Sequence, residues 1–528
     1  MLAHAQHKPS RAPLAGMLFG LLLSSIAQAQ PEPSQIQGML PERVATELDR
    51  AKVPFGNAAF YVTEVDSSKS ARNGTDAARL VFNAYKPMNP ASTVKLVTTF
   101  AALDILGPTF TWKTGLYVDG PIHNGVLEGN LYIKGSGDPK LVTENVWMML
   151  RQLQAKGVRD IRGSLILDRS AFDLGKTTDA VQFDGDPMRA YNAQPDALLI
   201  NYNAITFNFV PNQVDGKVLI NAEPRQSDWV VVNGVKLTSG DCNDWRSTIK
   251  ADFTTTSMAQ FAGTFSDRCE DKSLFVNASY LYPNDFTART IRALWFELGG
   301  KITGASREGK TPPEARMVTE WVSPALAEVV RDVNKYSNNV MAKHVFLTLG
   351  RYQDKLKDMP QPAVEMNAFE SNDSSLQAAA DPSNLRPARY DQSVRFIKTW
   401  LGKVNLNPND IVLENGSGLS RIERISAANM ARILKQAYQS PVMPEFMSSL
   451  PLIGYDGTMK KRLNNDSVAG QAHIKTGSLR DVSAVAGYVL AESGKRYAVV
   501  GFINHDNAYA ARPALDALLH WTYNDLAR

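Results

Sequence analysis

The hydrophobic pattern near the end of the chain predicts three antiparallel strands followed by a helix. Apolar and β-branched residues run through 472–478, 482–490 and 496–504, and the Ser493-Gly494 pair marks a hairpin between the last two runs. A helical pattern then covers 510–526. This part of the chain therefore predicts a sheet with helices packed against it.

A second informative pattern is a helix that is apolar on every side. Asn89 can cap this helix, Pro90 fits its first position, and Gly107 stops it. A helix that is apolar all round is buried inside a domain. Two polar residues, Ser92 and Lys95, fall within its first turns.

Between 111 and 311 the pattern changes to short β-rich runs that are separated by turn residues. Helical patterns return at 323–336 and 338–349. Residues 353–388 are polar and rich in Pro, Asn, Ser and Asp, which predicts a mobile surface insertion. The β-rich runs are GVLEGNLYIKG (125–135), GSLILDRSAF (163–172), ITFNFVPN (205–212), GKVLINAEP (216–224), DWVVVNGVKL (228–237) and KSLFVNASYL (272–281).

The length of 528 residues exceeds what one hydrophobic core usually serves, so we expect more than one domain. The two flanks, 30–110 and 312–528, are together long enough for a complete domain. We therefore predict that 111–311 is a β-rich insertion of one or two small domains in a loop of the flanking domain. Insertion of this kind is tolerated where chain ends lie close together.

Residues 1–29 have the pattern of an export signal. Lys8 and Arg11 give a positive start, 14–26 is apolar, and Ala27-Gln28-Ala29 has the small-x-small form of a cleavage site. A membrane anchor is the alternative, although the apolar run is short for a span. We expect a periplasmic protein without a transmembrane segment, loosely membrane-associated at most. The formal net charge of +4 is no argument for a nucleic-acid partner.

The two cysteines, Cys242 and Cys269, are close in sequence. In an oxidising compartment an even number of cysteines predicts one disulfide, with two separate buried thiols as the alternative. There is no C-x-x-C motif, and none of the seven histidines belongs to an H-E-x-x-H motif. Because no metal-ligand set is visible, we expect neither a metal nor a cofactor.

The spacing of Ser92 and Lys95 indicates a nucleophile with its base. Residues i and i+3 of a helix share a face, so the two side chains can touch. A lysine amine in an apolar site loses proton affinity and can accept the serine proton. The start of a helix also favours negative charge that develops nearby.

Two further motifs complete a possible site. Ser337 can pass a proton to the leaving amine, and Asn339 can hydrogen-bond a substrate amide. In Lys475-Thr476-Gly477, the cation and the hydroxyl can hold a terminal carboxylate, and the glycine admits a substrate backbone along an edge strand. The backbone amides of Ser92 and Ser478 can form an oxyanion hole. Each motif is common by itself, but the three together and in this order are specific.

The S-x-x-K, S-x-N and K-T-G set resembles that of the penicillin-recognising serine enzymes. Further segments resemble the class C low-molecular-mass penicillin-binding proteins, which are D-alanyl-D-alanine carboxypeptidases and endopeptidases. The resemblance runs from about residue 40 to the C-terminus. The segments are GNLYIKGSGDPKL (129–141), IRGSLILDRSAFD (161–173), AYNAQPDAL (190–198), YSNNVMAKHVF (336–346), ENGSGLSR (414–421), LPLIGYDGTMKKR (450–462) and IKTGSL (474–479).

This resemblance implies an α+β fold of the serine β-lactamase and transpeptidase type, in which helices flank an antiparallel sheet. It implies hydrolysis of peptidoglycan stem peptides through an acyl-enzyme, with β-lactam antibiotics as covalent inhibitors. The family inserts small domains between S-x-x-K and S-x-N, which agrees with the inserted region predicted above. The chain departs from the family at Glu414-Asn415, where the family commonly has an aspartate before Gly-Ser-Gly.

The resemblance also implies residues that bind the rest of the substrate. In the family, an aspartate at the place of Asp186 and an aromatic at the place of Tyr191 face the cleft, where the aspartate meets the amine of a diaminopimelate side chain. Arg421 is the matching candidate for the carboxylate end. A solvated loop acid is the alternative for Asp186.

Two other functions remain open from the sequence. A serine β-lactamase would use the same three motifs, and Tyr336-Ser337-Asn338 also has the Y-x-N form of one β-lactamase class. A wall-binding scaffold on the same fold would need no catalysis, although all the reactive side chains are present. The long insertion and the flanking segments favour the peptidase.

Overall fold

The described chain mixes helices with sheets, which confirms the predicted α+β class. The predicted export signal and residues 357–384 of the predicted surface insertion lie outside the described residues. Gln37–Arg528 forms one compact unit, so the proposed domain boundaries stay a prediction. The computed structural model describes residues 39–66, 78–175, 183–281, 286–356 and 385–526.

A five-stranded antiparallel sheet carries the K-T-G motif on its edge strand. The strand order is β2-β1-β22-β21-β20, so β20 lies at the edge, as the sequence predicted. The three strands predicted near the C-terminus are confirmed with almost the same bounds. The strands are β1 (Ala58–Glu64), β2 (Ala78–Phe82), β20 (Ala472–Leu479), β21 (Val482–Leu490) and β22 (Arg496–Asn504).

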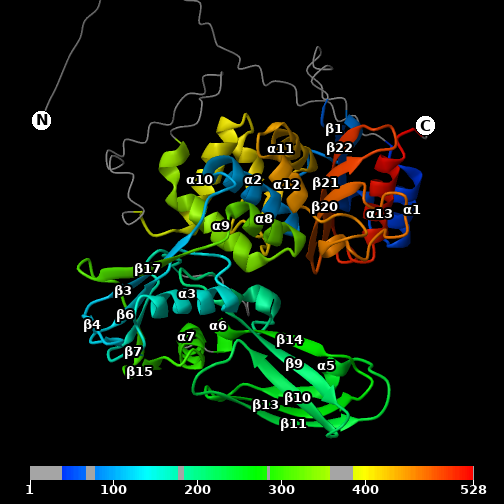
Figure 1. Cartoon of the computed structure of the whole chain (residues 1–528). Helices are drawn as coiled ribbons and strands as arrows, with labels where there is room; N and C mark the ends of the chain where they lie inside the picture. Colours follow the sequence, from blue (N-terminus) through cyan, green and yellow to red (C-terminus); the bar gives the residue numbers. More distant parts are fainter. Residues whose placement is uncertain (1–38, 67–77, 176–182, 282–285, 357–384, 527–528) are drawn as a thin grey trace, which may run out of the picture. The chain divides into compact units, whose positions relative to one another are not determined.

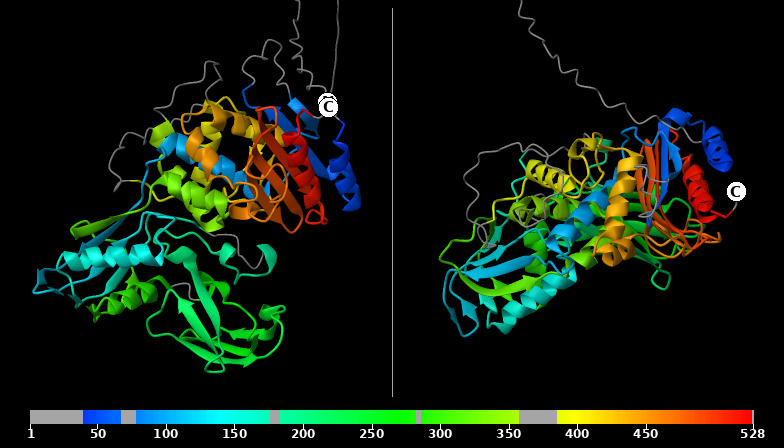
Figure 2. Two further views of the ribbon diagram at one scale, coloured as in Figure 1. Left: turned by 45° about the vertical axis from the view of Figure 1, so that its right-hand side comes forward. Right: turned by 90° about the horizontal axis from the view of Figure 1, so that it is seen from above.

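Helices cover both faces of this sheet (Figures 1 and 2). Two helices pack on one face, and the larger core lies on the other. Because both faces are covered, β21 is buried along nearly its whole length. The pair on one face is α1 (Glu42–Arg50) and α13 (Arg512–Tyr523). The larger set is α2 (Lys95–Leu106), α8 (Leu326–Lys335), α9 (Asn339–Arg351), α10 (Tyr390–Lys403), α11 (Ala427–Gln439) and α12 (Met443–Ser449).

The predicted helix that holds Ser92 divides into two elements. A short 3-10 helix, η3 (Ala91–Val94), precedes α2, which begins at Lys95. Ala91 has a φ of 44°, outside the α-helical region, so a regular α-helix cannot start before Ser92. The predicted helix is therefore present, but its first turn, which carries Ser92, is 3-10 and not α-helical. Residues i and i+3 eclipse one another in a 3-10 helix, so Ser92 and Lys95 still share a face.

Two smaller sheets occupy the first part of the β-rich region. In the first, β3 pairs with β17, which follows the predicted end of the insertion at 311. The helix α3 (Thr143–Ala155) packs beside them with α7 (Phe286–Glu297), and neither helix was predicted from the sequence. The first sheet contains β3 (Lys113–Val118), β6 (Leu131–Lys134), β8 (Leu165–Asp168), β16 (Ser306–Glu308) and β17 (Arg316–Val322). The second contains β4 (Ile122–His123), β5 (Val126–Leu127), β7 (Asp160–Ile161) and β15 (Lys301–Ile302).

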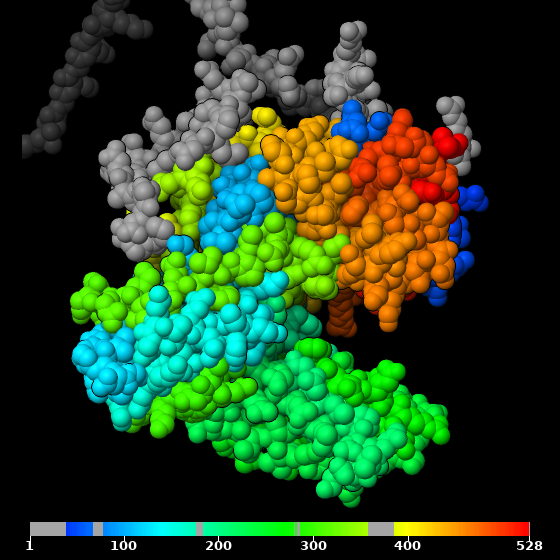
Figure 3. Space-filling view, viewed as in Figure 1, coloured from blue at the N-terminus to red at the C-terminus, as the bar shows by residue number. Residues whose placement is uncertain are grey.

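A six-stranded sheet forms the rest of the β-rich region, whose surface appears in green in Figure 3. Two of its strands, β12 and β13, were not predicted. The last predicted run, 272–281, is a strand only at its start and ends as the short helix α6 (Ala278–Leu281). In order across the sheet, the strands are β12 (Ile249–Asp252), β13 (Met258–Ser266), β11 (Val230–Thr238), β10 (Lys217–Glu223), β9 (Ala204–Asn212) and β14 (Lys272–Asn277).

Cys242 and Cys269 form a disulfide, which confirms the predicted pairing and excludes two separate thiols. Each cysteine follows one of two neighbouring parallel strands, β11 and β13, which stay in register to their last residues, Thr238 and Ser266. Two chain segments that leave adjacent strands at the same end come close enough for a disulfide. The bond thus links two loops at one end of the six-stranded sheet.

Candidate active site

The three short motifs meet at one place. The Lys95 Nζ lies 2.9 Å from the Ser92 Oγ and donates to the Asn339 Oδ1 at 2.7 Å. The Lys475 Nζ donates to the Ser337 Oγ at 2.8 Å. Both lysines have 0% exposure. The structure therefore brings together the five residues to which the sequence analysis assigned the chemistry.

A third group contacts Lys95 that the sequence analysis did not identify. The Lys95 Nζ also donates to the backbone carbonyl of Ser417, 322 residues away in the chain. The only sequence feature at this position was the Gly-Ser-Gly segment, which is part of the family resemblance. A backbone carbonyl carries no residue-type signature, so its role depends on where the turn lies.

The S-x-N motif lies where α8 ends and α9 begins. Ser337 has a φ of 56°, which turns the chain sharply between the two helices. Asn338 caps α9, since its side chain accepts a hydrogen bond from the Met341 backbone N–H at 3.0 Å. Asn339 is the first residue of α9. This cap places Ser337 and Asn339 on the side of the turn that faces the two motif lysines.

Burial lowers the pKa of both motif lysines. The pKa of Lys95 is held well below its usual value, first by desolvation and then by the positive charges of Lys475 and Lys343, whereas Glu423 acts in the opposite direction. Burial lowers the pKa of Lys475 to about 7. A lysine whose pKa is lowered by burial gives up its proton more readily and can then act as a base.

The edge strand β20 lies directly against the turn that carries Ser92. A Cβ atom at Gly477 would lie 2.7 Å from the Pro90 carbonyl oxygen and 3.1 Å from the Ser92 nitrogen. A Cβ atom at Gly418 would lie 2.6 Å from the same nitrogen. Only glycine permits such close approach of two backbones. The K-T-G and Gly-Ser-Gly segments therefore both border the candidate nucleophile.

The remaining predicted residues of the edge strand contact two residues that the sequence analysis missed. The Thr476 Oγ1 donates to the Thr458 Oγ1 at 2.8 Å, and an Arg512 N–H donates to the Ser478 Oγ at 2.8 Å. Thr458 lies within one of the segments that carry the resemblance, whereas no local pattern indicates Arg512. The edge strand thus has a second cation at its far end.

One segment of the β-rich region reaches the site. The Tyr191 carbonyl accepts from the Asn339 Nδ2 at 3.4 Å, and the Tyr191 hydroxyl donates to Asp184 at 2.8 Å. Asp186 forms an ion pair with Arg189 at 2.6 Å. Asp184, which the sequence analysis did not identify, therefore holds Tyr191, and Asp186 already has a partner in its own segment.

Arg421 contacts the start of the same segment. Its guanidinium lies 4.8 Å from the ring centre of Phe183 and forms an ion pair with Asp481 at 2.9 Å. The three residues predicted to bind the rest of the substrate, Asp186, Tyr191 and Arg421, therefore belong to the segment beside Asn339 or contact it.

Two of the cavities that the described residues form open on the β-rich region. Asp186, Arg189 and Tyr191 line one cavity of about 400 Å³, together with Arg246 and Phe275 from the six-stranded sheet region. Its wall therefore combines charged groups with an exposed aromatic ring, and it includes two of the predicted substrate-binding residues.

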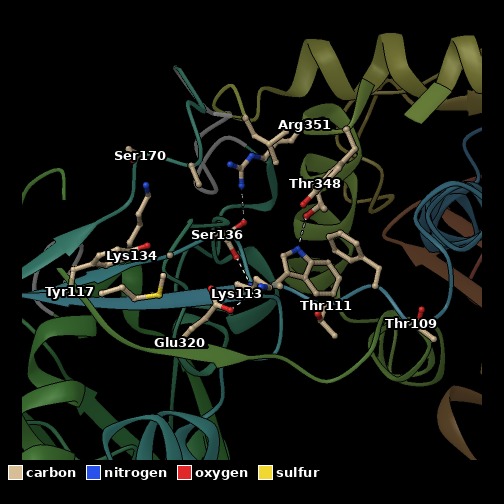
Figure 4. A pocket seen from close by; sticks show the side chains of 18 residues that line it. Thr109, Thr111, Lys113, Tyr117, Lys134, Ser136, Ser170, Glu320, Thr348 and Arg351 are labelled. Atoms are coloured by element: carbon tan, nitrogen blue, oxygen red, sulfur yellow. Dashed lines mark hydrogen bonds and ion pairs between the residues drawn. The ribbon is translucent and has the colours of Figure 1, made fainter. Parts of the chain in front are cut away.

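The second cavity, of about 610 Å³, lies where β3 and β6 meet α9 (Figure 4). Trp112, Lys113, Lys134 and Arg351 are among the residues that line it, and Arg351 donates to the Ser136 carbonyl at 3.2 Å. No residue of the three motifs lines this cavity. It is therefore separate from the candidate active site.

Within the described ranges, no cluster of three or more His, Cys, Asp and Glu side chains is arranged to hold a metal ion. No helix in the same ranges is both long and apolar enough to cross a membrane.

Comparison with known proteins agrees with this geometry. The D-alanyl-D-alanine carboxypeptidase DacB of Haemophilus influenzae is 25% identical over 460 residues, which cover 86% of each chain. The crystal structure of penicillin binding protein 4 (dacB) from the same organism matches with a TM-score of 0.68 and 23% identity, over 92% of this chain and 99% of that one. A structure of that protein complexed with a β-lactam matches with a TM-score of 0.65 and 24% identity, over the same shares.

The family profile named D-Ala-D-Ala carboxypeptidase 3 (S13) matches residues 41–379 and 373–524. This match covers most of the chain and confirms the family that the motifs indicated. The chain belongs to the D-Ala-D-Ala carboxypeptidase 3 (S13) family and is a serine-type carboxypeptidase.

Proposed function

We propose that the chain hydrolyses D-alanyl-D-alanine bonds of peptidoglycan stem peptides, and D-alanyl cross-links between them, through an acyl-enzyme on Ser92. The observation that carries this proposal is the set of three contacts that the Lys95 Nζ makes with Ser92, Asn339 and the Ser417 carbonyl. Family membership supplies the reaction class, and these contacts support the proposed roles of the individual residues.

Acylation begins with a neutral Lys95. A neutral amine has two N–H groups and one lone pair; the Asn339 Oδ1 and the Ser417 carbonyl accept the two N–H groups. The lone pair then faces the Ser92 hydroxyl, 2.9 Å away, and takes its proton as the Oγ attacks the substrate carbonyl. The backbone N–H groups of Ser92 and Ser478 stabilise the negative oxygen that forms.

Departure of the leaving group needs a proton on its amine. Ser337 is placed to deliver this proton, since its hydroxyl is hydrogen-bonded to Lys475 at 2.8 Å. The C–N bond breaks, the D-alanine amine leaves, and the acyl group stays on the Ser92 Oγ. The proton that Lys95 took from Ser92 passes to Ser337 and replaces the one given to the amine, so Lys95 is neutral again. Water then attacks the ester carbonyl while Lys95 accepts a proton from that water, and Lys95 returns this proton to the Ser92 Oγ as the ester C–O bond breaks.

The edge strand β20 is the proposed place for the substrate backbone. An extended peptide can pair with an edge strand through main-chain hydrogen bonds, while its terminal carboxylate meets Lys475 and Thr476. Arg512, which donates to Ser478 at 2.8 Å, adds a positive charge at the end of this strand. Gly477 keeps the approach to Ser92 free of a side chain.

The cavity beside Tyr191 is the proposed place for the rest of the stem peptide. It is lined by Asp186, whose side chain is 44% exposed and can exchange Arg189 for a substrate amine. Arg421 is the proposed partner for a substrate carboxylate. Residues 1–29 are proposed as an export signal, which would place the enzyme in the periplasm with its substrate.

The first experiment is covalent labelling by a fluorescent penicillin. We expect the Ser92→Ala variant to lose labelling and to keep the thermal unfolding temperature of the wild type. Ser448→Ala, an exposed serine on α12, is the matched control and should label normally. Labelling of Ser92→Ala, or of another residue in the wild type, would contradict the proposed nucleophile.

The second experiment identifies the substrate. Purified peptidoglycan and a free pentapeptide are digested separately, and the products are resolved by mass. Loss of one alanine from the pentapeptide indicates carboxypeptidase activity, and release of monomers from cross-linked dimers indicates endopeptidase activity. Fast penicillin hydrolysis without either product would favour a β-lactamase instead.

A further inference from the structure

A buried carboxylate lies behind the candidate base. Glu423 has 0% exposure, and its Oε1 accepts hydrogen bonds from the backbone N–H groups of residues 414–416, at 3.1, 3.1 and 3.0 Å. A carboxylate that accepts three consecutive backbone donors fixes the conformation of that turn. The next residue, Ser417, supplies the carbonyl to which Lys95 donates.

The turn between Glu423 and that carbonyl has little freedom to move. A Cβ atom at Gly416 would lie 2.3 Å from the ring of Phe346, and the Gly416 carbonyl accepts from Thr98 at 2.8 Å. The Asn415 Oδ1 accepts from the Ser417 backbone N–H at 3.0 Å. A displacement at the carboxylate would therefore move the Ser417 carbonyl as well.

We propose that Glu423 is a positioning residue for Lys95. By holding the 414–418 turn, it keeps the Ser417 carbonyl where that carbonyl orients the Lys95 amine toward Ser92. The inference rests on the proposed function, because it takes Lys95 as the base. Glu423 itself touches neither the nucleophile nor the substrate, and its effect passes through the turn and through its charge.

The charges around the base allow this role to be tested. Lys95 is faced by Lys475 on β20, by Lys343 on α9 and by Glu423, and Glu423 is also faced by Glu414. Glu423 raises the pKa of Lys95, whereas Lys343, whose own pKa is lowered to about 8 by burial, lowers it. Replacing these two residues should therefore shift the titration of Lys95 in opposite directions, which simple loss of structure would not do.

The experiment measures the acylation rate constant with a fluorescent penicillin as a function of pH. Glu423→Gln removes the charge and keeps an acceptor oxygen. Because the pKa of Lys95 should then fall, the acid limb of the pH–rate profile should move to lower pH by about one unit or more. In Lys343→Met, the acid limb should move to higher pH by a similar amount. Glu328→Gln, an exposed carboxylate on α8, is the matched control and should leave the profile unchanged.

Acid limbs that stay in place, or that move in the same direction in both variants, would overturn the proposal. Thermal unfolding shows whether each variant is folded. If Glu423→Gln does not fold, Glu423→Asp replaces it, because it keeps the charge and withdraws the oxygen from the turn. We then expect slower acylation with an unmoved acid limb, and wild-type rates would contradict the positioning role. Absence of labelling at Ser92 in the wild type would contradict the proposed function instead.

Discussion

The charged side chains of the candidate active site and those of the segment beside Tyr191 occupy opposite environments. Around the five-stranded sheet, Lys95, Lys475 and Glu423 are fully buried and hydrogen-bonded. In the β-rich region, the side chains of Asp186 and Arg189 are 44% and 55% exposed. Both regions are rich in strands, so strand content does not explain the difference.

The difference follows from how the sheets are covered. Helices cover both faces of the five-stranded sheet, so groups near its edge can be withdrawn from water. The six-stranded sheet has one covered face, and its strand β10 alternates between exposed residues and buried or half-buried ones. Desolvation is what lowers a lysine pKa toward neutrality. The first region can therefore provide a base, whereas the second can provide surface contacts with a substrate.

The largest change in the acylation rate should come from removing a buried charge near the five-stranded sheet. Lys95→Met should slow acylation by about 10²–10⁴-fold, because a serine without a general base is a poor nucleophile. Thermal stability should hold or rise, since methionine replaces a buried cation with an apolar side chain of similar shape. Penicillin labelling rates and thermal unfolding measure the two effects. Lys113→Met, an exposed lysine paired with Glu320, is the control and should leave both unchanged.

Removing the disulfide tests whether acylation of Ser92 is independent of the stability of the six-stranded sheet. Cys242→Ser combined with Cys269→Ser should destabilise the six-stranded sheet by about 3 kcal/mol, because the bond restricts the unfolded chain. Hydrogen exchange should rise in β11 and β13, while penicillin labelling of Ser92 should keep its wild-type rate. A fall in labelling that parallels the rise in exchange would show that the catalytic region depends on this sheet.

A smaller effect is expected from the exposed charges of the β-rich region. Asp186→Asn should lower kcat/KM about 10–100-fold on a stem peptide with a free side-chain amine, because a charge-assisted hydrogen bond is lost. A peptide without the amine should react at the wild-type rate. Arg189→Gln frees Asp186 from its ion pair and should act in the opposite direction on the first peptide. Equal rates for all three proteins on both peptides would make Asp186 an ordinary surface residue.

The smallest effect concerns the pH dependence of carboxylate binding. Burial lowers the pKa of Lys475 to about 7, and a bound carboxylate would raise it. The complex then holds more protons than the free enzyme above that pH, so affinity should fall as pH rises, by about tenfold per unit at most. Calorimetry of a D-alanyl-D-alanine peptide with Ser92→Ala, between about pH 6 and pH 9, measures this slope. Lys475→Arg, which stays charged, should flatten the slope.

Much of the candidate site could be predicted because its chemistry lies in short local patterns. Ser92 and Lys95 are three residues apart, and Ser337 and Asn339 are two apart, so each pair is brought together by one turn of chain. The strands at 472–478, 482–490 and 496–504 could also be predicted from local sequence, since apolar runs and turn residues mark them. The departure of Ser92 from a regular α-helix was not visible, because a positive φ at Ala91 leaves no signature in the sequence.

The sequence by itself determined the class of chemistry, the order of the motifs and the edge strand. Only the tertiary structure decided which backbone groups complete the site. The Ser417 carbonyl, 322 residues from Lys95, and the Glu423 carboxylate behind it belong to no short motif. Likewise, only the structure shows that Asp184 accepts a hydrogen bond from the Tyr191 hydroxyl. Such contacts depend on how distant segments pack when the chain folds, whereas caps, turns and apolar periodicity are set within a few residues.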